Sequence, residues 1–136
     1  MTSFNKILLT VIASAALAAQ AFAHHSTKGI YNEAVEMELK GTVKEWSFIN
    51  PHPFLTITAV GEDGVMHNWD LSYGGAAVVH LQRQGYTKDT FKPGETIIVK
   101  GHPALKPGVY GLLMEGGGNI PTREDGTPVV AGGSMF

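Results

Sequence analysis

Short runs of alternating apolar and polar residues, separated by glycine and proline, constrain the fold of this 136-residue chain most. Apolar residues or glycine occupy every second position from Val35 to Val43, with charged or polar residues between them. This period of two predicts a half-buried strand. The alternation shifts by one residue near Lys44-Glu45, as a β-bulge would shift it, and continues through Trp46 and Phe48.

Later segments predict four further strands, over residues 54–60, 65–71, 96–101 and 110–115. Residues 75–84 have helical spacing instead, and Gly85 is expected to end that helix. Three strands, a helix and two more strands predict an all-β domain with one helix, a small five-stranded OB-like Greek-key barrel. An open antiparallel sheet with a covering helix is the alternative.

The first 23 residues have the three parts of an export signal. Lys6 gives the positive charge, residues 7–19 the apolar run, and Ala21-Phe22-Ala23 the small-x-small cleavage site. The apolar run is shorter than the ~20 residues that span a bilayer. We expect a periplasmic or secreted protein with no membrane span after cleavage, and a retained anchor is the alternative.

Composition excludes several classes of protein. The chain has no cysteine, so neither a disulfide scaffold nor a thiolate metal site is available. Its formal net charge is −2, and Lys6 is the only charged residue of the signal, so cleavage makes the remainder one unit more negative. A basic nucleic-acid surface is therefore not expected.

One small domain is the expected organisation. We expect a signal peptide at 1–23, an extended segment at 24–34, an OB-like β domain at 35–115, and a Gly-rich C-terminal hairpin and tail at 116–136.

Cleavage after Ala23 would make His24 the first residue and His25 the second. The free amine and the imidazole of an N-terminal histidine can close one chelate ring, and nitrogen donors of this type suit Cu(II). His24 and His25 are therefore candidate copper ligands, an arrangement called a histidine brace when a further imidazole joins. The alternative is a disordered terminus whose sequence merely suits the peptidase.

Two later histidines are further candidates. His52 lies between Pro51 and Pro53, so less ordering is needed for it to bind a metal. The alternative is a turn residue whose ring hydrogen-bonds a backbone carbonyl. His102 precedes Pro103 at the end of a strand and is a weaker candidate. It could hydrogen-bond to a metal ligand without binding the metal itself, or it could hold a loop in place.

No group of residues predicts catalysis. His67 and Asp70 are three apart on an expected strand, so they face opposite sides and do not form a dyad. Trp46, Phe48, Phe54 and Trp69 are expected to fill the core rather than to stack nucleic-acid bases. The leading hypothesis is a periplasmic, non-enzymatic protein that binds Cu(II). An unknown periplasmic protein partner stays an open alternative. The alternative is a barrel that binds a small ligand or a protein without metal, and an enzyme ranks behind both.

Six strings along the chain carry a resemblance: AHHS at 23–26, GTVKEW at 41–46, NPH at 50–52, HNWDL at 67–71, LQRQGYTKDTFKPGE at 81–95 and VKGHP at 99–103. In this order they resemble a family of exported bacterial proteins catalogued as a domain of unknown function, DUF6152, over His24 to about Leu113. The matching positions include His24, His25, Ser26, Gly41, Val43, Trp46, Asn50, Pro51, His52, Trp69, Arg83, Gly85, Lys92, Pro93, Gly94, Gly101, His102 and Pro103.

The chain departs from the family pattern in one region. Members often carry an acidic residue near Ser72 and begin the helix with a Ser-Pro-Asn-like string, whereas this chain has Gly74-Gly75-Ala76. The resemblance implies a periplasmic location and a small β fold, and it implies no reaction.

Overall fold

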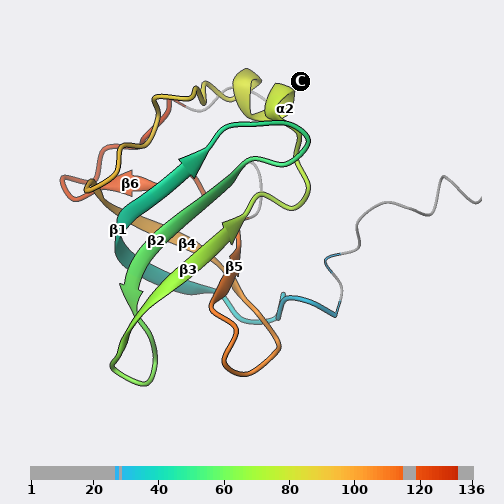
Figure 1. Ribbon diagram of the computed structural model, residues 1–136, viewed down its shortest axis with the longest axis vertical. Helices are drawn as coiled ribbons and strands as arrows, with labels where there is room; N and C mark the ends of the chain where they lie inside the picture. The colour runs from blue at the N-terminus through green and yellow to red at the C-terminus, as the bar shows by residue number, and fades with distance from the viewer. Residues whose placement is uncertain (1–26, 28, 115–118, 132–136) are drawn as a thin grey trace, which may run out of the picture.

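Six strands and one short helix make up the computed structural model, which describes residues 27, 29–114 and 119–131 (Figure 1). His24 and His25 lie outside these residues. The elements in chain order are β1 (Met37–Ser47), β2 (Phe54–Val60), β3 (Met66–Ser72), α2 (Val78–Arg83), β4 (Thr96–Pro103), β5 (Gly111–Leu113) and β6 (Thr122–Arg123).

Five of these strands close into a barrel. β1, β2 and β3 form an antiparallel meander, β5 pairs parallel to β3 and antiparallel to β4, and β4 pairs back to β1. The β1–β4 pairing runs from Met37 to Thr42 and is the contact that closes the sheet. The OB-like Greek-key barrel expected from the sequence is therefore confirmed, and the open sheet is wrong.

β1 pairs with two strands, β2 and β4, because it is long and bends. Gly41 and Thr42 pair with both β2 and β4, so the strand passes from one side of the barrel to the other at this point. A Cβ atom on Gly41 would lie 2.8 Å from Ile57 Cδ1 and 2.8 Å from the carbonyl oxygen of Thr58. Only glycine allows β1 to approach β2 this closely. The register then shifts between Val43 and Glu45, as the alternation predicted.

The helix α2 is shorter than the expected range of 75–84. Gly74 and Gly75 have φ angles of 66° and 81°, which a right-handed helix does not use, so the helix begins only at Val78. It ends as predicted: Gly85 has φ 97°, and the N–H of Tyr86 donates to the carbonyl of Leu81. Leu81 faces the barrel interior and is 1% exposed.

The barrel interior holds aliphatic side chains from every strand of the barrel. Leu55, Ile57 and Ile97 are fully buried. Next to them lies a group of five aromatic rings, which we call the Trp46 cluster: Trp46, Phe48, Tyr73, Tyr86 and Phe91. Trp69 is also buried, but it packs against Tyr110 instead.

Phe54 corrects one expectation about the core. The sequence placed it among the core aromatic residues, whereas its side chain is 39% exposed. The period of β2 explains the difference, because Leu55 and Ile57 face inward and Phe54 has the opposite phase.

Residues 119–131 pack onto the barrel. β6 pairs with β4, and the chain turns back at Asp125-Gly126. Arg123 Nε donates to Glu95 Oε1 at 2.8 Å, which ties this hairpin to the turn before β4. Val129 and Val130 are buried beyond it, so this hairpin adds to the core.

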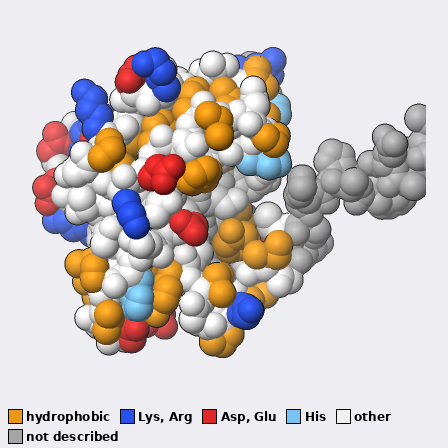
Figure 2. All heavy atoms as spheres, in the orientation of Figure 1, with side chains coloured by type: hydrophobic (Ala, Val, Ile, Leu, Met, Phe, Trp, Pro, Cys, Tyr) orange, Lys and Arg blue, Asp and Glu red, His pale blue; other side chains and the backbone are white. Residues whose placement is uncertain are grey.

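Exposed apolar side chains lie on the two loops at the bottom of Figure 1, and Figure 2 shows apolar atoms at the same end of the molecule. Val60, Val65 and Met66 flank the β2–β3 hairpin, and Leu105 and Val109 lie on the β4–β5 loop. None of the helices in the described part of the chain has the length and apolar character of a membrane span.

Candidate functional site

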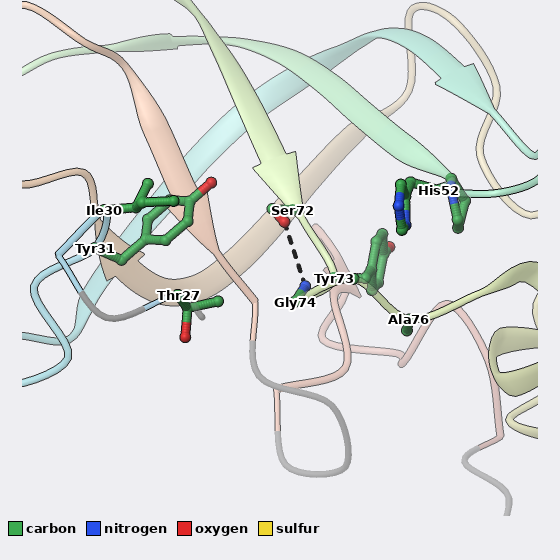
Figure 3. A pocket seen from close by; sticks show the side chains of 10 residues that line it. Thr27, Ile30, Tyr31, His52, Ser72, Tyr73, Gly74 and Ala76 are labelled. Atoms are coloured by element: carbon green, nitrogen blue, oxygen red, sulfur yellow. Dashed lines mark hydrogen bonds between the residues drawn. The ribbon is translucent and has the colours of Figure 1, made fainter. Parts of the chain in front are cut away.

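A cavity of about 230 Å³ opens between three segments of the chain, and we call it the N-terminal pocket. Its walls come from Thr27, Ile30 and Tyr31, from the β1–β2 connection at His52-Pro53, and from residues 72–76 after β3. In Figure 3, Thr27, Ile30 and Tyr31 lie on one side of Ser72 and Gly74, and His52 and Tyr73 lie on the other. The pocket therefore lies between the first described residues and His52, a candidate ligand that both the sequence and the structure place in a loop.

Backbone hydrogen bonds hold the first described segment against the barrel. Tyr31 forms a β-bridge with Ala104, and the N–H of Leu105 donates to the carbonyl of Ile30 at 2.9 Å. The N–H of Asn32 donates to the carbonyl of Pro103 at 2.8 Å. This short pairing extends the end of β4 and brings Thr27 to the pocket wall.

His52 is exposed, and the buried Pro53 anchors its loop. The peptide bond between Asn50 and Pro51 is cis. The proline rings restrict the backbone on both sides of His52, and His52 lines the pocket wall.

His102 has a different position and a different role. It lies in β4, and its Nδ1 donates to the carbonyl oxygen of Val35 at 2.8 Å. This bond holds the N-terminal segment to the barrel, which matches the loop-fixing role considered for it. His102 does not line the N-terminal pocket.

Tyr73 connects the pocket to the Trp46 cluster. Its hydroxyl has no hydrogen-bond partner among the described residues. Burial, and then the neighbouring Tyr86, raise the pKa of Tyr73 well above its ordinary value. A phenolate is therefore disfavoured at this position, so Tyr73 supplies a neutral wall rather than an anionic ligand.

Residues 27, 29–114 and 119–131 contain no group of three or more His, Asp or Glu side chains that could hold a metal ion by itself.

Comparison with protein-family models identifies the family of this chain. A family model described as a family of unknown function, DUF6152, matches residues 11–113. The chain belongs to the DUF6152 family. No curated protein is detectably similar to it in sequence.

In this DUF6152 protein, a second cluster of polar side chains lies at the other end of the barrel, and sequence reasoning missed it. His67 Nε2 lies 2.8 Å from Asp63 Oδ2, and the Tyr110 hydroxyl donates to the same oxygen at 3.2 Å. The rings of His67 and Tyr110 stack with centroids 3.7 Å apart. His67 therefore lies at the mouth of the barrel, and its acidic partner is Asp63.

A signal for this cluster was present in the sequence. Asp63 lies in the Asp-Gly turn that joins β2 to β3, and a hairpin of that length brings its side chain back over His67. The contribution of Tyr110 could not be anticipated, because it depends on the parallel pairing of β5 with β3. Asp70, by contrast, faces outward and accepts a hydrogen bond from Thr56, so the exclusion of a His67–Asp70 dyad agrees with the structure.

Asp63 is expected to make the stability of this protein depend on pH. The backbone N–H of Val65 first, and then His67, hold the pKa of the Asp63 carboxyl below its ordinary value of 3.8. A carboxyl with a lowered folded-state pKa stabilises the fold above its unfolded-state pKa and loses that effect as the pH falls. We expect Asp63→Asn to be less stable than the wild type at pH 7, and the difference to shrink as the pH falls below 3.8.

Urea unfolding at several pH values, followed by circular dichroism, measures this difference. Asp89→Asn is the matched control, because the Asp89 side chain is 70% exposed and its ion pair with Lys88 is solvated. A stability difference for Asp63→Asn that stays constant from pH 7 to pH 3 would contradict the assignment.

Proposed function

We propose that this DUF6152 protein is exported and binds Cu(II) as a non-enzymatic periplasmic protein. The ligands would be the amine and the imidazole of His24 after cleavage of residues 1–23, completed by the imidazole of His25 or His52. The observation that carries the proposal is that Thr27 and His52 line the same pocket.

Chain length limits how far the His24 amine can lie from the pocket wall. An extended chain spans at most about 3.6 Å per residue, so His24 can lie no more than about 11 Å from Thr27 along the chain. Ile30, Tyr31 and Asn32 are held by backbone pairing to residues 103–105 at the end of β4, which keeps this segment beside the pocket.

The donor set favours copper over other divalent ions. An amine and neutral imidazoles are nitrogen donors, and Cu(II) has the highest affinity for such sites in the divalent series. No thiolate competes for a softer metal, because the chain has no cysteine. The amine exists as a ligand only after export, which would couple metal binding to arrival outside the cytoplasm.

The size of the N-terminal pocket supports this proposal over an organic ligand in the same place. A volume of about 230 Å³ is below the roughly 300–1,000 Å³ that is usual for small-molecule sites. A metal ion held by side chains at the pocket wall needs much less room.

Titration of Cu(II) into the chain that begins at His24, by calorimetry and electron paramagnetic resonance, tests the proposal. Acetylation of the His24 amine removes that donor and should lower the affinity by more than the roughly 10–100-fold that loss of an outer-shell partner costs. His52→Ala should weaken binding or change the spectrum if His52 is the third ligand.

His80→Ala is the matched control, since His80 is exposed on α2 and does not line the pocket. It should leave the affinity unchanged. Equal weak binding by the native and the amine-acetylated chains would refute the proposal, and strong binding that survives acetylation but not His52→Ala would place the site away from the terminus.

A further inference from the structure

A second, larger cavity lies at the end of the barrel where the apolar side chains gather. Its volume is about 390 Å³, within the range of roughly 300–1,000 Å³ that small organic ligands occupy. The β2–β3 hairpin forms one wall and the β4–β5 loop forms the other, and the two extend side by side at the bottom of Figure 1. We call it the hairpin pocket, and it shares no residue with the N-terminal pocket.

The inner surface of the hairpin pocket is apolar and partly aromatic. Trp69, Tyr110 and Met37 line it, and Trp69 is only 5% exposed. The Trp69 and Tyr110 rings meet edge to face with centroids 5.2 Å apart, so the aromatic surface is already assembled. A flat or branched apolar group would rest mainly against the half-buried Tyr110, because little of Trp69 is exposed.

The mouth of the hairpin pocket carries charges of both signs on opposite walls. Glu62 and Asp63 lie on the hairpin, and Lys106 lies on the β4–β5 loop. Asp63 is already held by Val65, His67 and Tyr110, which fixes the hairpin wall. Glu62 is then the carboxylate available on that wall for a ligand, and Lys106 is the ammonium on the facing wall.

We propose that the hairpin pocket binds a small zwitterion with an apolar body, of which a free α-amino acid with an aromatic or long aliphatic side chain is the simplest example. Glu62 would receive the ligand ammonium, Lys106 its carboxylate, and Trp69 with Tyr110 its apolar side chain. A zwitterion can pair with both Glu62 and Lys106, whereas a ligand with only one charge can pair with one of them, so the two signs favour a zwitterion. Neither the copper proposal nor the family assigns this pocket a role.

The two tryptophans of the chain provide a built-in reporter. Trp69 lines the hairpin pocket, whereas Trp46 lies in its own cluster and donates its indole N–H to the carbonyl of Thr87. Nuclear magnetic resonance of the ¹⁵N-labelled protein resolves the two indole signals. Addition of L-phenylalanine should shift the Trp69 signal and leave the Trp46 signal in place.

Two analogues with a single charge test the selection for a zwitterion. Phenethylamine lacks the carboxylate and 3-phenylpropanoate lacks the amine, and each should bind about tenfold more weakly than L-phenylalanine. Glu62→Gln should weaken the two probes that carry an amine, and Lys106→Met the two that carry a carboxylate. Both substitutions are at exposed positions, so the fold should be retained.

Three results would overturn this inference. They are a Trp69 indole signal that does not move at the highest soluble concentration of L-phenylalanine, equal shifts of both indole signals, and equal affinity for all three probes. His52→Ala is the control for independence, and it should leave the binding of L-phenylalanine unchanged because His52 lines the other pocket.

Discussion

Gly101→Ala is expected to destabilise the protein by about 2–4 kcal/mol, at or above the upper end of what added methylenes usually cost in a core. A Cβ atom on Gly101 would collide with the backbone carbonyl of Leu113, in the neighbouring strand β5. Backbone cannot rotate away as a side chain can, so β5 itself must move. That movement would weaken the pairing of β5 with both β3 and β4, on which barrel closure depends.

Gly111→Ala is the matched control, because Gly111 is also a buried glycine at the β4–β5 contact. The nearest atom to its Cβ would be Ala104 Cβ at 3.5 Å, an ordinary contact. Its stability should stay within about 1 kcal/mol of the wild type, since alanine also reduces the entropy of the unfolded chain. Urea unfolding gives both values. A Gly101→Ala protein as stable as Gly111→Ala would contradict the described packing of β5 against β4.

The alternation in the sequence was sufficient to predict most of the strands. The expected range of 54–60 coincides with β2, and the shift expected at Lys44-Glu45 coincides with the bulge in β1. Such features depend on one strand and its immediate neighbour, so a local period of two contains the information. The helix start was wrong because two glycines with positive φ lie within the apolar pattern.

Contacts between distant segments could not be predicted in the same way. The pairing of β4 with β6, and the docking of Tyr31 against Ala104, join residues that are far apart in the sequence and carry no local signal. The same holds for the candidate sites. His52 was identified from its two flanking prolines, whereas Glu62, Lys106 and Tyr110 come together only because two loops meet at one end of the closed barrel.

Trp46→Ala is expected to have the other large effect, a loss of about 3–5 kcal/mol. The Trp46 ring contacts all four other rings of its cluster, at centroid distances between 5.1 and 6.4 Å. Its indole N–H also donates to the carbonyl of Thr87 at 2.9 Å, which fastens the segment after α2 to the bulged end of β1. Removal of the side chain would leave a cavity and a carbonyl that loses this bond.

Trp46→Phe separates the two contributions. Phenylalanine retains a ring among the other four but cannot donate to Thr87, so the loss should be nearer the ~1 kcal/mol of one hydrogen bond plus a small cavity. Thermal and urea unfolding of both variants measure the difference. Because Tyr73 belongs both to this cluster and to the N-terminal pocket, Trp46→Ala should also weaken the proposed Cu(II) binding more than Trp46→Phe does. Equal destabilisation by the two variants would mean that the hydrogen bond, and not the aromatic packing, is what Trp46 contributes.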